Sequence, residues 1–253
     1  MVPSGHTDGW TLFFLAAFVQ CVHLQRNNSS LLDADPLSEN QTYRPVLQPT
    51  EVAPTTGSYV IIGRDGTPCI KATVGAEFIV TEEKKTWFFN LNPSRVMVSG
   101  YCGNDEALLS LTLPGNASGL HFTFRKEKES VYVADLTAYL SPQPACKGCF
   151  NKTYLGSVTQ KKLFEAASGQ SFKCTTEQSI RLGSQLSIKL GHLQMQAFSL
   201  QDGQYGIALE CWPDFDRRII PHIIRAVLIG LLLITVLSLL LIRERRRSGY
   251  ERL

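Results

Sequence analysis

The feature that most constrains this chain is an apolar segment near its C-terminus, residues 219–242, which Arg243-Glu-Arg-Arg-Arg247 follows directly. Its second part, Ala226–Ile242, has hydroxyl groups as its only polar side chains. A helix of about 20 apolar residues spans the ~30 Å hydrocarbon core of a bilayer. Because arginine clusters are retained on the cytoplasmic side, the segment predicts one transmembrane helix and a cytoplasmic tail, residues 243–253.

The charge of the chain is concentrated in that tail. The whole sequence has a formal net charge of +3, and the tail alone, with five arginines and two glutamates, accounts for all of it. A basic surface for nucleic acid is therefore not expected, and no nucleic-acid partner is predicted. The arginines could also be a nuclear signal, but their position against the apolar segment favours a stop-transfer flank.

A second apolar run, Trp10–Val19, lies near the N-terminus. It is too short to span a bilayer and is typical of a signal-peptide core, although no lysine or arginine precedes it. We expect a signal peptide at residues 1–21, cleaved after Cys21; a retained signal anchor is the alternative. Cleavage there would leave six of the seven cysteines, an even number that suits an oxidising compartment.

Five N-x-[ST] sequons lie between the two apolar segments and none lies beyond them. This distribution predicts a type I membrane glycoprotein with a luminal N-terminal part. Residues 22–56 are rich in proline, lack apolar periodicity and predict a glycosylated, extended stalk. The predicted glycosylation sites are Asn27, Asn28, Asn40, Asn116 and Asn151.

Residues 57–217 have the pattern of an all-β domain. Apolar and polar residues alternate over residues 109–113 and 120–125, which is the signal of half-buried strands. Turn dipeptides such as Asp65-Gly66 and Asp202-Gly203 separate the runs, so antiparallel connections are expected. One helical turn is expected, at Lys162–Ala167. Further strands are predicted at residues 58–62, 87–91, 131–140, 186–190 and 195–200.

The six remaining cysteines allow fifteen connectivities, which sequence alone does not resolve. Cys69 and Cys102 are 33 residues apart, and Cys174 and Cys211 are 37 apart. These cysteines and their surroundings resemble the lysosome-associated membrane glycoprotein (LAMP) family. The motifs that carry the resemblance are Cys69-Ile-Lys-Ala72, Phe89-Asn-Leu-Asn-Pro93, Ser99-Gly-Tyr-Cys-Gly103, Gly169-Gln-Ser-Phe-Lys-Cys174, Gln196-Ala-Phe198, Gly203-Gln-Tyr-Gly206, Ile220-Pro221 after Cys211, and Gly249-Tyr-Glu-Arg-Leu253.

The resemblance implies a β-prism luminal domain with disulfides Cys69–Cys102 and Cys174–Cys211. It covers about residues 57–253, and one luminal domain makes the chain similar to single-domain members such as dendritic-cell LAMP and macrosialin, without their mucin-like stalk. It also implies a lysosomal and late-endosomal membrane protein with a role in lysosome membrane integrity, vesicle fusion or autophagy. Other lysosomal membrane proteins or lipids are the partners it suggests.

The tail ends in a sequence that resembles the family's sorting signal, Gly249-Tyr250 with Leu253 at the terminus. Clathrin adaptor medium subunits are the proteins expected to bind this signal, with Tyr250 and Leu253 in two pockets and the backbone added to a sheet edge. The same four-residue pattern at Tyr43 and at Tyr59 falls in the luminal part, where no cytosolic adaptor reaches it. Lysosomal delivery is therefore predicted, with the cell surface as a second location.

Two other functions compete with this interpretation. An endocytic or cell-surface receptor would use the tail for internalisation and the β domain for a ligand. A luminal hydrolase is not favoured, because the sequence lacks Gly-x-Ser-x-Gly and His-Glu-x-x-His, and His121 and His192 fall in strand patterns. We predict no enzyme activity, no catalytic or metal site and no cofactor. Arg225, at the luminal end of the span, is expected to snorkel to headgroups rather than contact a partner.

One pair of cysteines, Cys146 and Cys149, has no counterpart in the resemblance. Redox chemistry would need the first cysteine at a helix N-terminus, and a zinc site would need two more ligands. This pair instead follows Ser141-Pro-Gln-Pro144 in an all-β context. A local structural disulfide is predicted over a free or intermolecular thiol, a redox pair or half a zinc site. Peptide mapping under non-reducing conditions should recover one peptide cross-linked through both residues; alkylated thiols at both positions would refute the disulfide.

Overall fold

The computed structural model describes residues 43–83, 85–144 and 151–250. Several predicted features lie outside these ranges. They are the signal peptide, the first part of the expected stalk, the sequons at Asn27, Asn28 and Asn40, the pair Cys146 and Cys149, and Leu253.

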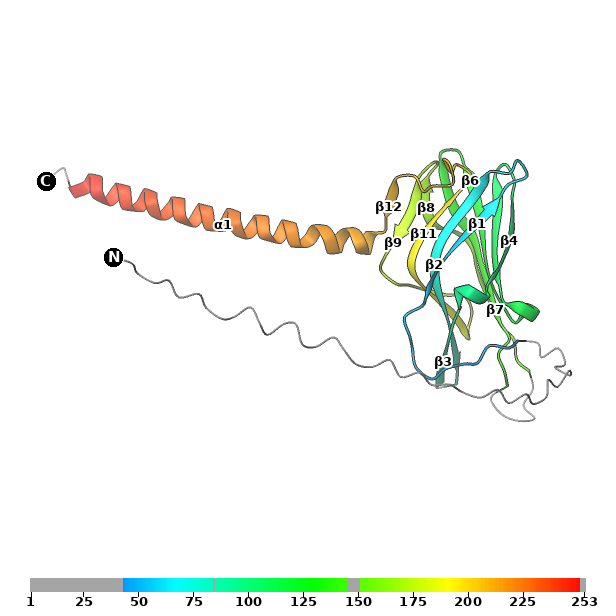
Figure 1. Ribbon diagram of the computed structural model, residues 1–253. Helices are drawn as coiled ribbons and strands as arrows, with labels where there is room; N and C mark the ends of the chain where they lie inside the picture. Colours follow the sequence, from blue (N-terminus) through cyan, green and yellow to red (C-terminus); the bar gives the residue numbers. More distant parts are fainter. Residues whose placement is uncertain (1–42, 84, 145–150, 251–253) are drawn as a thin grey trace, which may run out of the picture. The chain divides into compact units, whose positions relative to one another are not determined.

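The described part of the chain contains two β-sheets followed by one long helix (Figure 1). The first sheet has the order β1-β2-β11-β9-β12, with β3 paired to β2 and β10 paired to β11. All its pairs are antiparallel except β9 with β12, which is parallel. Its strands are β1 (Thr56–Ile62), β2 (Pro68–Glu82), β3 (Lys85–Asn90), β9 (Ser171–Cys174), β10 (Gln178–Arg181), β11 (Leu186–Ala197) and β12 (Ala208–Glu210).

The second sheet is fully antiparallel and follows chain order, β4-β5-β6-β7-β8. Short 3-10 turns precede β4 and β6: η1 (Pro93–Arg95) and η2 (Pro114–Asn116). The all-β expectation is confirmed. The strands are β4 (Met97–Cys102), β5 (Glu106–Thr112), β6 (Ser118–Glu127), β7 (Ser130–Leu140) and β8 (Tyr154–Ala167).

The predicted alternation separates the core from the surface most clearly on β6. The side chains of Leu120 and Phe122 have no exposed area, whereas His121 between them is half-buried. On β5, Leu109 and Leu111 are also unexposed, but Ser110 between them is buried as well. Each of these apolar side chains contributes roughly 1.5–3 kcal/mol when it leaves water. Because Phe78 and Ile188 from the first sheet belong to the same apolar cluster, the two sheets share one core.

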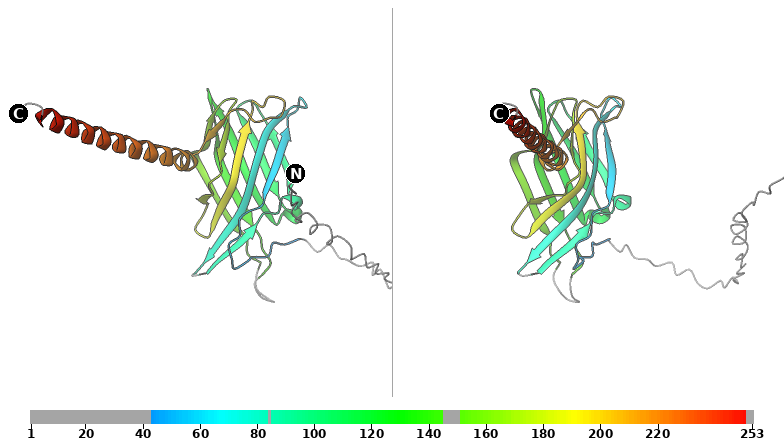
Figure 2. Two further views of the ribbon diagram at one scale, coloured as in Figure 1. Left: turned by 60° about the vertical axis from the view of Figure 1, so that its left-hand side comes forward. Right: turned by 90° about the vertical axis from the view of Figure 1, so that its left-hand side faces the viewer.

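The two sheets also meet at their edges. Strand β1 of the first sheet lies beside β4 of the second, and β8 lies beside β9 and β11; Figure 2 shows the two layers from two further sides. The edge between β1 and β4 is covalently closed, because Cys69 at the start of β2 pairs with Cys102 at the end of β4. This architecture agrees with the prism that the resemblance implies.

Two local predictions were wrong. Residues 162–167, expected to form a helical turn, belong to β8: Leu163 pairs with Val133 and Ala166 with Val131. Strand pairing in a buried sheet outweighs the weak local preference of a six-residue segment. The expected strands 186–190 and 195–200 are joined in one strand, β11, which ends at Ala197, so residues 198–200 lie outside it. The register of β11 shifts between Gly191 and Gln194, where His192 has a φ of 49°.

The C-terminal helix, α1, runs from Trp212 to Tyr250 and is longer than the predicted span at both ends. Among the residues described, it is the one helix long and apolar enough to cross a membrane, and the apolar window is not buried. Its extension toward the C-terminus is reasonable, because arginine and glutamate are good helix formers. The first residues of the expected tail are therefore helical in this structure.

Residues 43–54, expected to belong to an extended stalk, lie against the domain. Gln48 forms a backbone bridge with Phe88, and Tyr43 and Leu47 pack on the core. The composition of the segment suggested a solvated chain, but tertiary contacts hold it in place. We call residues 43–54 the N-terminal strap.

The folding stability of the domain is expected to depend on pH through His121. It lies on β6, half-buried, and stacks on Tyr139 at 5.8 Å between ring centroids; burial lowers the pKa of His121 below its usual 6.5. Because the unfolded chain binds a proton at His121 first, stability should fall as pH decreases through 6.5. We predict that His121→Gln has a flatter stability profile between pH 7 and 5 in urea denaturation of the full chain in detergent. Exposed His192→Gln is the control, and a profile for His121→Gln as steep as that of the wild type would contradict the assignment.

Candidate functional site: the membrane-proximal junction and the strap

The junction between the β domain and α1 is cross-linked by a disulfide. Cys174, the last residue of β9, pairs with Cys211, which directly precedes α1. This is the second pairing that the resemblance implies. Asp214 also lies near both sulfur atoms, but the sulfurs are joined to each other, so they cannot act as thiolate ligands for a metal ion.

Asp214 adds a set of hydrogen bonds to the same junction. Its carboxylate accepts from the backbone N–H groups of Thr175, at 2.5 Å, and Thr176, at 2.9 Å, and from the Thr176 hydroxyl at 2.6 Å. Arg218, one turn further along α1, donates to Glu210 of β12 at 2.9 Å. Charge-assisted bonds of this kind are stronger than neutral ones, so the first turns of α1 have both covalent and polar attachments to the domain.

Hydrogen bonds of the Gln196 side chain hold the loop that follows β11. The Gln196 side chain is 3% exposed; it donates to the Ser199 carbonyl at 2.6 Å and accepts from the Gly206 N–H at 2.8 Å. A Cβ atom on Gly206 would lie 1.9 Å from the Gly169 carbonyl oxygen. These motif residues therefore hold the loop after β11 against the sheet and are explained by packing, without a ligand.

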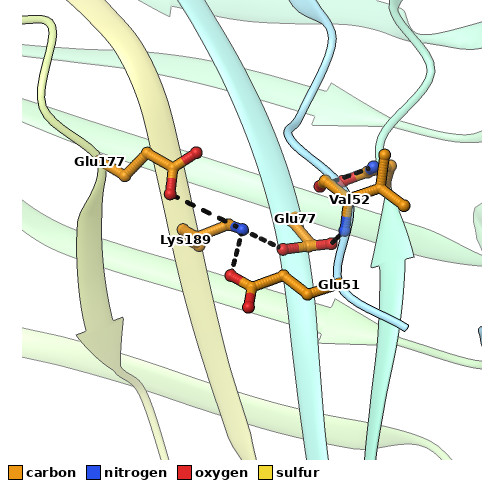
Figure 3. Close-up of polar contacts among 6 residues, drawn as sticks. Glu51, Val52, Glu77, Glu177 and Lys189 are labelled. Carbon is orange, nitrogen blue, oxygen red and sulfur yellow. Dashed lines mark hydrogen bonds and ion pairs between the residues drawn. The ribbon is translucent and has the colours of Figure 1, made fainter. Parts of the chain in front are cut away.

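A buried ion pair holds the N-terminal strap to the first sheet. Lys189 of β11 is 5% exposed and Glu77 of β2 is fully buried; the Lys189 Nζ lies 2.6 Å from a Glu77 carboxylate oxygen (Figure 3). Glu51 of the strap accepts from Lys189 at 2.5 Å, and Glu177 lies at 3.8 Å. The other oxygen of Glu77 accepts from the Val52 N–H of the strap at 3.0 Å. One lysine thus connects both central strands with the strap.

The electrostatics of this cluster favour a charged lysine. Burial alone would lower the pKa of Lys189. The hydrogen bonds that its ammonium donates to Glu51 and Glu77, together with the negative charges of Glu77 and Glu177, outweigh burial and raise the pKa. Because a raised lysine pKa contributes stability at every pH below about 10.5, the contribution of Lys189 is not lost by its own titration in an acidic compartment. The strap also lies so close to β2 that no side chain fits at Gly75, since a Cβ atom there would lie 2.7 Å from the Pro54 carbonyl oxygen.

The remaining predicted site residues are placed at the surface or at the helix end. Asn116, in the turn between β5 and β6, and Asn151, before β8, are exposed, as an oligosaccharide acceptor must be. Glycosylation at both positions stays a prediction. Gly249 and Tyr250 form the last turn of α1. Lys189 and Glu77 were not singled out from the sequence, because polar residues in strand patterns carry no local sign of their partners. Asp214, in the first turn of α1, was not singled out either. Gln196 was named only as part of a motif that carries the resemblance, without its hydrogen bonds.

Comparison with known proteins agrees with the two-disulfide prism. The sequence profile described as "Lysosome-associated membrane glycoprotein 2-like, luminal domains" matches residues 44–212. This chain belongs to the lysosome-associated membrane glycoprotein family. The profile begins within the strap, in agreement with the strap's contacts to the domain. LAMP-family proteins are structural glycoproteins of the lysosomal membrane, and this chain is accordingly a lysosomal membrane glycoprotein.

Individual relatives support the assignment. Lysosome-associated membrane glycoprotein 3 of Homo sapiens is 33% identical over 214 residues, which cover 83% of this chain and 49% of the relative. Its Rattus norvegicus counterpart is 35% identical over 190 residues, covering 73% of this chain and 44% of the relative. The chain therefore spans about half the length of the curated relatives it matches.

Solved structures show the same fold. The crystal structure of human LAMP-3, also called DC-LAMP, superimposes with a TM-score of 0.56 at 32% identity, covering 62% of this chain and 99% of that one. The membrane-proximal domain of mouse LAMP-1 gives a TM-score of 0.56 at 24% identity, covering 64% of this chain and 99% of that one. The similarity to mouse LAMP-1 concerns the fold alone.

The buried ion pair gives a stability prediction. Lys189→Met should lower the free energy of unfolding by about 3–5 kcal/mol, because the Glu77 carboxylate would stay buried without a cation. Adding Glu77→Gln should restore most of that loss, since the neutral amide can still accept from Val52. Urea denaturation of the full chain in detergent measures both.

A surface lysine provides the matched control. Lys161→Met, on the exposed side of β8, should change the unfolding free energy by no more than about 0.5 kcal/mol. Independent, additive losses for Lys189→Met and Glu77→Gln would show that the two side chains do not form a coupled pair.

Proposed function

We propose that this chain is delivered to lysosomes and late endosomes by its C-terminal sequence, and acts there through binding rather than catalysis. The observation that supports delivery is the position of Tyr250, eight residues after Ile242 and beyond a flank of four arginines. That spacing places the tyrosine within reach of a protein bound to the cytoplasmic membrane surface. The binding partners proposed for the tail are clathrin adaptor medium subunits.

Recognition would require a change in the last turn of α1. A Tyr-x-x-apolar peptide binds in an extended form, with the backbone added to a sheet edge and two side chains in pockets. The final turn of a helix lacks intrahelical partners for its last carbonyls, and Gly249 disfavours the helix by about 1 kcal/mol relative to alanine. The end of α1 is therefore the part of the helix that is easiest to unwind, and an adaptor would select its extended form.

The luminal domain is proposed to have a structural or interaction role, in lysosome membrane integrity, vesicle fusion or autophagy. The family's character as structural membrane glycoproteins supports this role, as do the motif residues around Gln196, which act in packing. Other lysosomal membrane proteins or lipids are the proposed partners. A domain cross-linked by disulfides at Cys69–Cys102 and Cys174–Cys211 suits long residence in a degradative lumen, because the cross-links limit the unfolded forms that proteases cut.

Mutation of the tail tests the delivery proposal. Tyr250→Ala should move most of the protein from lysosomes to the plasma membrane, because one of the two pocket-filling side chains is removed. The measurement combines co-localisation with a lysosomal marker and surface biotinylation. Ser248→Ala, which lies outside the four-residue signal, is the matched control and should remain lysosomal. Unchanged lysosomal staining of Tyr250→Ala would exclude Tyr250 as the signal, and a wild-type protein found mainly at the surface would favour the receptor alternative.

A further inference from the structure

The first part of α1, on the domain side of the apolar segment, is amphipathic. Three basic side chains recur at spacings of four and three residues, which places them on one face of the helix. Isoleucines occupy the other face of the same two turns. All three basic side chains and three of the four isoleucines are exposed. The basic residues of this face are Arg218, His222 and Arg225, and the isoleucines are Ile219, Ile220, Ile223 and Ile224; Arg217, also exposed, precedes them.

The length of the apolar segment determines where this face meets the bilayer. Ala226–Ile242 is 17 residues long, or about 25 Å as a helix, which is slightly less than the ~30 Å hydrocarbon thickness. With Arg243 at the cytoplasmic boundary, Arg225 lies at the opposite boundary or just inside it. Its stem then reaches outward, so its guanidinium lies at the level of the headgroup phosphates.

Two of these three side chains have no acidic partner within the described part of the chain. Arg218 bonds to Glu210, but Arg225 and His222 have no hydrogen bond or ion pair to any side chain that the structure describes. Asp214, the nearest acid on the same side of the helix, is engaged by Thr175 and Thr176. The positive charge closest to the membrane therefore needs an anion from outside this chain.

Aromatic residues lie at the domain end of the same segment, 13 residues or about 20 Å along α1 from Arg225. Trp212, 72% exposed, and Phe215, 39% exposed, stack at 5.8 Å in the first turn of α1. Tryptophan is enriched where headgroups meet water. An exposed aromatic pair, a basic face and an apolar face thus lie within the four turns of α1 that precede the apolar segment, on its domain side.

We propose that Arg218, His222 and Arg225 form a binding site for an anionic phospholipid headgroup in the leaflet that faces the β domain. A guanidinium donates two parallel hydrogen bonds to phosphate oxygens. A zwitterionic headgroup carries its own cation and repels the second arginine, whereas an anionic headgroup does not. The site thus selects lipids by net charge, and about 1 kcal/mol per basic residue corresponds to roughly fivefold enrichment.

The inference rests on one element of the proposed function, that the β domain and Arg225 face the lumen while Arg243–Arg247 face the cytosol. It does not depend on sorting by Tyr250. An experiment in vesicles, with the orientation measured by protease access to the β domain, therefore separates failure of the lipid site from failure of the delivery signal.

The test uses the full chain in phosphatidylcholine vesicles, with its β domain outside. Spin-labelled phosphatidylglycerol or spin-labelled phosphatidylcholine is introduced into the outer leaflet by exchange, and electron spin resonance gives the fraction immobilised by the protein. The wild type should prefer phosphatidylglycerol by at least about fivefold. Arg225→Gln should reduce the preference by about fivefold, and Arg225→Lys should keep part of it, because the charge remains and the planar fork is lost.

The matched control removes the same charge from the other end of the span. Arg245→Gln should leave the outer-leaflet preference unchanged. Equal preferences for wild type and Arg225→Gln would overturn the proposal, as would a preference abolished by Arg245→Gln. Both variants should still insert, because each removes a charge near a membrane span.

Discussion

The shared apolar core between the two sheets is the interaction on which the rest of the domain depends. Each sheet buries one face, with Phe78 and Ile188 on one side and Leu109 and Phe122 on the other. Roughly 1.5–3 kcal/mol per large side chain opposes the backbone entropy lost in ordering the twelve strands of the described residues. Because the core uses one face of each sheet, the outer faces and connecting turns stay free for Asn116, Asn151 and His121.

The cross-links act on the edges of that core. Cys69–Cys102 joins β2 of one sheet to β4 of the other, and Cys174–Cys211 joins β9 to the residue before α1. The Lys189 cluster also connects separate segments, but without a covalent bond, because one buried ammonium bonds β11 to β2 and to the N-terminal strap. Both ends of the domain sequence are thereby fastened to the first sheet, one by charge and the other by a disulfide with the Asp214 bonds beside it.

Much of the fold could be predicted from the sequence, because the determining signals are local. Alternation at residues 109–113 and 120–125 identified β5 and β6 correctly, and Asp65-Gly66 and Asp202-Gly203 are turns with positive φ at glycine. The errors occurred where distant pairing decides. β8 takes its extended form from Val131 and Val133 of β7, and the strap takes its position from Lys189, 138 residues from Glu51. A polar residue in a strand pattern does not reveal which distant partner will bury it.

The helix α1 shows how one element combines two requirements. Cationic residues bound its apolar part at both ends, Arg225 and Arg243, 18 residues or about 27 Å apart. That separation is close to the hydrocarbon thickness, so the helix has little freedom to slide along the membrane normal without moving a charge into lipid. Because Cys211 and Asp214 attach the helix to the domain, the depth set by Arg225 also limits the distance between the domain and the bilayer. At the other end, the same limit keeps Tyr250 within a few turns of the cytoplasmic surface, where the adaptor is proposed to bind. The charge of Arg225, which is costly to move into lipid, thus fixes the depth of the helix and with it the distances of the β domain and of Tyr250 from the membrane.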